Sequence, residues 1–202
     1  MFKKLAAEAL GISDIGVIVG PADYNKVDAD DYLFSEDGEK IFFLIKSRKD
    51  EYCFTNLALI HVDGDSAVSS KRSIKRYDYS SHAITNVSIE TAGTLDMDIE
   101  LKFNVDSLVF SIDVKKTFIE QLKDIYKALI SIGKQQRRDA LCRDNALHAL
   151  NATASVHKLN IAPGEGGLVN QYGQLLDALN TAMLDTYTKR DFSDVFTKYI
   201  HN

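Results

Sequence analysis

The clearest pattern in the sequence is a strict alternation of apolar and polar positions between residues 95 and 103. The apolar positions are Leu95, Met97, Ile99, Leu101 and Phe103. Because side chains two positions apart share one face of a strand, this segment predicts a β-strand with one face in the core and the other in water. After a turn at residues 104–107, the apolar positions are Leu108, Phe110, Ile112 and Val114. The two runs together predict a β-hairpin.

Shorter apolar runs, each bounded by Gly, Asp, Ser or Asn, precede this hairpin. They lie at residues 40–46, 52–55, 57–62, 73–79 and 84–91. With the hairpin they make about seven strands, at the spacing expected of an all-β sandwich or barrel. We therefore predict a mainly β fold in which antiparallel strands surround one apolar core.

Helical periodicity replaces the alternation after residue 116. Thr117 and Glu120 have the spacing of an N-terminal capping box. A wide apolar stripe follows at Phe118, Leu122, Ile125 and Leu129. Gly133 predicts the end of this helix, because glycine is the usual residue just past a helix C-terminus.

Beyond Gly133 the β-branched residues thin out, which predicts a separate helical region. We predict an antiparallel hairpin here. It consists of a helix from about Gln135 to Ala154, a connector at residues 162–167 and a second helix. The second helix has apolar positions on one side at Leu168, Tyr172, Leu175, Leu179 and Met183. Asp191 is placed to cap a last helix. Its apolar positions are Phe192, Val195, Phe196, Tyr199 and Ile200.

The predicted domains are residues 1–133, with a short N-terminal helix, and residues 134–202. The N-terminal helix has Phe2, Leu5, Ala6 and Ala9 on one face, so we interpret it as a docked helix and not as a signal peptide. Cys53 and Cys142 lie far apart in apolar surroundings, which indicates reduced thiols. Together these features predict a cytoplasmic location.

Composition restricts the class of protein further. A chain of 202 residues with 45% hydrophobic content has enough apolar residues for one core and an appendage. No apolar run approaches the ~18 residues that span a bilayer. The formal net charge of -5 argues against a general nucleic-acid binder, which usually has a dominant basic surface.

The tract between residues 54 and 101 also resembles a known family. It contains FTN, an apolar run ending in VDG, a basic segment, and YSSHAITNVSIETAG. This order resembles the bacterial pleckstrin-homology (PH-like) domains of the YvbH-like type over roughly residues 38–130. The resemblance implies a PH-like bent antiparallel β-barrel capped by one helix, an α-helical hairpin extension, and ring-like homo-oligomers. The chain departs from the family where Asp65, Ser66 and Ala67 follow VDG in place of a basic or glutamine-containing turn.

Clustered positive charge is the main candidate for ligand binding. The candidate residues are Lys46, Arg48, Lys49, Lys71, Arg72, Lys75 and Arg76. The first three surround the turn between the first two strands, where the resemblance implies the phosphoinositide site of eukaryotic PH domains. Lys75 and Arg76 project from opposite faces of their strand, which weakens a shared pocket. The alternative interpretation is a solvated basic edge that deters strand addition.

An acidic segment offers a second kind of contact. Asp28, Asp30 and Asp31 of one copy are candidates to meet Lys75 and Arg76 of the next, which predicts a head-to-tail interface. Such contacts close into rings when the rotation permits.

The sequence does not match the residue patterns of enzyme active sites or metal sites. DADDYLFSEDGE has Tyr32 and Leu33 where a calcium loop requires a ligand and a glycine. Cys53 and His61 fit inside a sheet without an orienting carboxylate. We therefore predict no catalytic residues, no metal site and no cofactor.

These observations predict a non-catalytic PH-like interaction and oligomerisation module. Its partners are a second copy of the chain or an unidentified protein, with no role for nucleic acid. The alternative is a peripheral binder of anionic lipid headgroups or phosphorylated ligands at a membrane surface. A hydrolase is the least favoured hypothesis, and it requires a deep pocket holding His61 or His82 beside a carboxylate.

Overall fold

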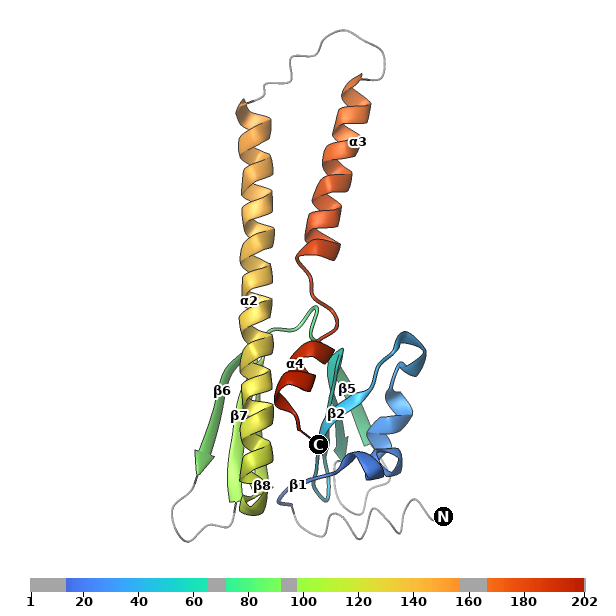
Figure 1. The fold of residues 1–202 in the computed structure, drawn as a ribbon, viewed down its shortest axis with the longest axis vertical. Coiled ribbons are helices and arrows are strands. Elements are labelled where there is room, and N and C mark those ends of the chain that lie inside the picture. The colour runs from blue at the N-terminus through green and yellow to red at the C-terminus, as the bar shows by residue number, and fades with distance from the viewer. Residues whose placement is uncertain (1–13, 65–71, 92–97, 157–166, 202) are drawn as a thin grey trace. The chain divides into compact units, whose positions relative to one another are not determined.

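The computed structural model describes residues 14–64, 72–91, 98–156 and 167–201. By its internal contacts the chain divides into two compact units. The first unit consists of Met1–Gly133 and Arg190–Asn202, and the helical unit consists of Lys134–Lys189. The predicted N-terminal helix lies outside the described residues. Figure 1 shows the ribbon with the elements labelled.

Two antiparallel sheets form the first unit. The five-stranded sheet has the order β1-β2-β3-β4-β5, with bounds Val17–Ile18, Ile41–Lys46, Glu51–Thr55, Ala58–Gly64 and Arg72–Asp78. The three-stranded sheet has the order β6-β7-β8, with bounds Ile84–Thr91, Asp98–Val105 and Leu108–Lys115. All seven predicted strands are present, and among the strands in the described residues only the two-residue strand β1 was not predicted.

The antiparallel strands of the predicted bent β-barrel are present, but they form two sheets and do not close into one barrel. A bridge at Gly16 links the sheets on one side. The Gly16 N–H donates to the Asp113 carbonyl over 2.7 Å, and the Lys115 N–H donates to the Gly16 carbonyl over 3.0 Å. On the other side, β5 is an outer strand of the five-stranded sheet and β6 is an outer strand of the three-stranded sheet.

The β7–β8 hairpin confirms the alternation found in the sequence. Phe103 pairs with Phe110, and their rings stack at 5.0 Å between centroids. The turn is shorter than predicted, since β7 continues to Val105 and Asp106 has the left-handed φ of 52°. Leu108 was predicted to face the core but remains 48% exposed, because it lies at the tip beside this turn. Leu95 and Met97 lie outside the described residues.

The helix after the strands is longer than predicted. α2 spans Ile119–Val156 after the 3-10 turn η4 at Lys116–Phe118. Thr117 lies inside that turn, whose N-cap is Lys115, so the predicted capping box is wrong. Leu122, Ile125 and Leu129 are buried in the core, as the stripe predicted.

Gly133 does not end this helix, so the predicted break before residue 135 is also wrong. A Cβ atom at Gly133 would lie 2.4 Å from the carbonyl oxygen of Ile84. This glycine therefore allows the helix backbone to pass close to the start of β6. The same lack of a side chain that suits glycine to helix ends suits it to close backbone contacts.

The helix α4, Ser193–Tyr199, lies after the helical unit in sequence but belongs to the core of the first unit. Phe192 and Phe196 are fully buried. The Phe196 ring stacks on Phe42 of β2 at 5.2 Å, and the Phe192 ring lies edge-on to Tyr79 at 5.6 Å. The predicted apolar face of this helix therefore contacts the sheets (Figure 1).

Asp191 connects the start of α4 to the five-stranded sheet. Its carboxylate accepts the Ser193 N–H over 2.7 Å and the Asn56 side-chain amide over 3.0 Å. Partial burial opposes its ionisation, but the hydrogen bonds from Ser193 and Asn56 and the charge of Lys40 lower the pKa of Asp191. The Phe192 N–H donates to the Asn56 carbonyl over 2.9 Å, so the two segments are joined twice.

Three short 3-10 helices cover the outer face of the five-stranded sheet. They are η1 Pro21–Lys26, η2 Asp28–Tyr32 and η3 Ser35–Asp37. A second apolar cluster lies between them and the sheet, and it includes Val27, Ala29 and Cys53. Burial raises the pKa of the Cys53 thiol, which keeps it protonated and unreactive. The sequence pattern does not predict this layer, because its segments are too short to show a period.

Candidate interaction surfaces

Three of the candidate basic residues form ion pairs with carboxylates of the first unit. Lys46 pairs with the buried carboxylate of Glu51. Lys75 lies 3.2 Å from Asp63, with both side chains more than one third exposed. Arg76 pairs with Glu39 over 2.9 Å. Each of these cations pairs with a different carboxylate, so they do not converge on one anion site.

Arg48, Lys49 and Arg72 lie around the β2–β3 turn. Lys49 lies 3.8 Å from Asp14, and Arg72 lies 3.5 Å from Asp28. Arg48 is exposed, and Lys71 lies outside the described residues. Binding of an anionic headgroup or phosphate by this set stays a prediction, which co-sedimentation with anionic vesicles at low and high salt tests.

The acidic residues proposed for a head-to-tail contact lie on η2. Asp28 contacts Arg72 of its own chain. Asp31 is exposed and Asp30 is half-buried. Asp28, Lys75 and Arg76 all form their described ion pairs with residues of the same chain. For the head-to-tail interface to form, these residues must exchange those partners for a second copy or bind both. The head-to-tail interface stays a prediction.

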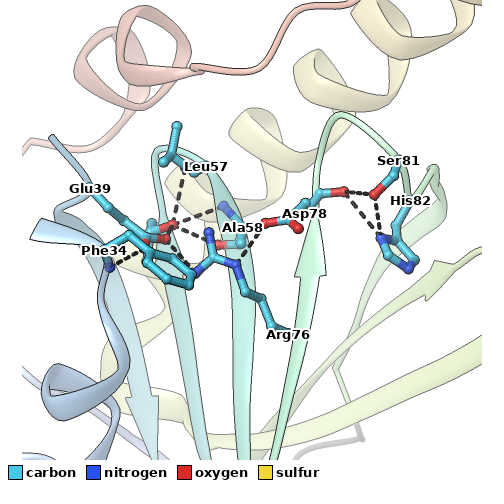
Figure 2. Close-up of polar contacts among 9 residues, drawn as sticks. Phe34, Glu39, Leu57, Ala58, Arg76, Asp78, Ser81 and His82 are labelled. Atoms are coloured by element: carbon cyan, nitrogen blue, oxygen red, sulfur yellow. Dashed lines mark hydrogen bonds and ion pairs between the residues drawn. The ribbon is translucent and has the colours of Figure 1, made fainter. Parts of the chain in front are cut away.

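Glu39 and Arg76 form the centre of a polar network that the sequence did not reveal. Figure 2 shows these side chains with Phe34 and Asp78. The fully buried Glu39 carboxylate accepts the Thr55 hydroxyl over 2.6 Å and the Phe34 N–H over 2.8 Å. Arg76 also donates from Nε to Asp78 over 2.7 Å. The network fixes the residues around η3 against the sheet and is structural in character.

Arg76 is held from two sides. Its guanidinium lies 4.7 Å from the centroid of the Phe34 ring, which is a cation–π contact. Partial burial disfavours its charge, but the hydrogen bonds to Glu39 and Asp78 outweigh this and raise the pKa of Arg76. The Arg76 guanidinium is therefore already bound by residues of its own chain.

The two histidines named for a hydrolase have structural surroundings. His61 Nε2 lies 3.3 Å from Asp50, and its ring stacks on Tyr52 at 4.6 Å. Burial, followed by the charge of Asp50, raises the pKa of Tyr52. Cys53 pairs with Ile60 in the register, so it lies on the opposite sheet face from His61.

His82 lies in the turn after β5 (Figure 2). Its Nδ1 lies 3.0 Å from the Ser81 hydroxyl and 3.2 Å from the Asp78 carbonyl. The Asp78 carboxylate is bound by Arg76, so it does not orient the imidazole. Within the described part of the chain, no three His, Cys, Asp or Glu residues are grouped as metal ligands.

The helical unit presents a different kind of surface. It contains the second half of α2, the helix α3 at Gly167–Asn180 and the π-helical turn η5 at Thr181–Thr186. Among its described residues, the large exposed apolar side chains are Leu141, Leu147, Leu175, Leu176 and Leu184. Leu175 and Leu179 were predicted to share one side of the second helix, but Leu175 is 44% exposed. Among the described residues, no helix is both long and apolar enough to cross a membrane.

Comparisons with known proteins cover both parts of the chain. A family model described as "Bacterial PH domain" matches residues 9–132. A second model, "YvbH-like oligomerisation region", matches residues 179–202. The second match begins in the last turn of α3 and includes η5 and α4.

Two relatives match almost the whole chain. The uncharacterized protein YvbH of Bacillus subtilis (strain 168) is 49% identical over 205 residues, covering 100% of both chains. The crystal structure of a PH domain containing protein from Exiguobacterium sibiricum 255-15 is 40% identical, with a TM-score of 0.81. It covers 93% of this chain and 100% of that one.

Proposed function

Because this chain belongs to the bacterial PH domain family and carries a YvbH-like oligomerisation region, we propose that it is a PH-like module that self-associates through its helical unit. The observation that carries this proposal is the group of exposed leucines on α3 and η5, which are Leu175, Leu176 and Leu184. Soluble proteins cover contiguous apolar surface, and a surface left open within one chain marks a contact with another.

We infer that the protein acts by binding and not by catalysis. His61 is stacked on Tyr52, and the Asp78 carboxylate is bound by Arg76. Asp50 lies beside the His61 imidazole, but the Cys53 thiol, the candidate nucleophile, lies on the opposite face of the sheet. Self-association gives several copies of the PH-like unit in one assembly, which strengthens weak contacts with any further partner.

The experiment is a mass measurement on the full chain by size-exclusion chromatography with light scattering. We expect a mass of at least two copies that persists at high salt, because apolar contacts are not screened. A mass that falls to one copy as salt rises would favour the charged interface of Asp28, Asp30, Asp31, Lys75 and Arg76. A single-chain mass at every salt and protein concentration would contradict the proposal.

A further inference from the structure

The return segment after η5 is attached to α2 by polar contacts. The buried Asp139 carboxylate accepts the Gln135 side-chain amide over 2.7 Å and the Lys189 N–H over 3.2 Å. One turn further along α2, Arg143 Nη1 donates to the Tyr187 carbonyl over 2.5 Å and to the Thr188 hydroxyl over 3.2 Å. We call Asp139 and Arg143 the polar clamp. It holds the segment that follows η5 against α2.

Three leucines of α3 and η5 are exposed. Leu175 and Leu176 are 44% and 42% exposed, and Leu184 is 58% exposed. Leu175, Leu176, Leu179 and Met183 fall on one side of the helix at positions i, i+1, i+4 and i+8. We call these four residues and Leu184 the leucine stripe.

The π turn extends the leucine stripe. The Tyr187 N–H donates to the Ala182 carbonyl over 3.0 Å, which is the i→i+5 spacing of a π-helix. Since a π turn contains more residues than an α turn, it rotates the chain less per residue. This brings Leu184 towards the side of Leu176, whereas a continuous α-helix would turn it away.

We propose that the leucine stripe is the surface by which two copies of the chain bind each other, stripe against stripe. This inference rests on the proposed function and names its interface. The partner is a second copy, because the YvbH-like oligomerisation region begins at residue 179, inside the stripe, and includes Met183 and Leu184. Two amphipathic helices that pair in this way bury their apolar sides in each other, as in helical bundles.

The test compares the double variant Leu175→Ala/Leu176→Ala with Leu141→Ala. Leu141 is 56% exposed on α2, two residues from both members of the polar clamp, so it lies on the opposite side of that helix. Alanine preserves helix propensity, so the helices should persist in both variants. We expect the double variant to raise the dissociation constant at least about tenfold, and Leu141→Ala to leave it unchanged.

The readouts are the mass at several concentrations and the helical circular dichroism signal. If the wild-type chain associates and the double variant associates equally well, the stripe is not the interface, although the proposed function stands. If Leu141→Ala weakens association as much as the double variant does, the stripe is also ruled out as the interface. A loss of helical signal in the double variant shows that these leucines pack within one chain, which also overturns it. If the wild-type chain is monomeric, the proposed function itself fails.

Discussion

Gly133 illustrates how one residue type predicts two different structures. From the sequence, a glycine after an apolar helical stripe indicates a helix end. In the structure it lies inside α2, where its missing side chain allows contact with the Ile84 backbone. A local pattern does not distinguish the two cases, because the reason for the glycine is a residue almost fifty positions away.

We expect Gly133→Ala to destabilise the protein. Alanine gains about 1 kcal/mol in helix propensity, but overpacking against a backbone atom costs about 1–3 kcal/mol, and Ile84 O lies only 2.4 Å from the new Cβ. The free energy of unfolding, measured in urea, should therefore fall. Gly173→Ala is the matched control, since nothing lies within 4 Å of its Cβ and the helix α3 should gain stability. Equal gains in both variants would contradict the close contact.

The Glu39–Arg76 pair supports a second prediction at this scale. Arg76→Met leaves the Thr55 hydroxyl and the Phe34 N–H as the described partners of the fully buried Glu39 carboxylate. Removing one partner of a buried pair costs about 3–5 kcal/mol, and we expect the lower end because Arg76 is 22% exposed.

Chemical denaturation of Arg76→Met and of Lys75→Met measures the difference. Lys75 is the neighbouring cation and pairs with Asp63 at the surface, so its removal should cost about 0–1 kcal/mol. A small loss in both variants would show that Glu39 does not need its cation.

Among the elements, strands were predicted better than helices. Alternation is a local property that one sheet face imposes on each strand, which is why β2 to β8 agree with the sequence. The length of α2 and the layer η1–η3 depend on contacts between distant segments, and periodicity does not contain that information. The polar clamp and the Glu39–Arg76 network were missed for the same reason.

The helix α4 was predicted from its period, but its place in the core was not. Phe196 is fully buried against Phe42. We expect Phe196→Ala to lower the stability of the first unit by about 3–5 kcal/mol, as for other buried phenylalanines. Thermal unfolding monitored by near-ultraviolet circular dichroism would show it. Leu141→Ala, at an exposed leucine outside the leucine stripe, should change stability by less than about 0.5 kcal/mol. Equal effects would contradict the burial of α4.

At the scale of the whole molecule, the resemblance to PH-like proteins predicted the architecture, and the family model and the Exiguobacterium structure support it. The exposure of the leucines was harder to predict. An apolar helical stripe has the same sequence pattern whether it packs within one chain or between two chains. Leu175 and Leu179 were recognised as one face, yet their exposure is a property of the folded chain.

The order of segments along the chain has a consequence for biosynthesis. The strands leave the ribosome first, and the helical unit follows before Phe192 and Phe196 emerge. During that interval Phe42 and Tyr79 lack the rings that cover them in the finished protein. Nascent chains should therefore pass through a partly open form, exposed to chaperones and proteases, until translation has moved beyond residue 196.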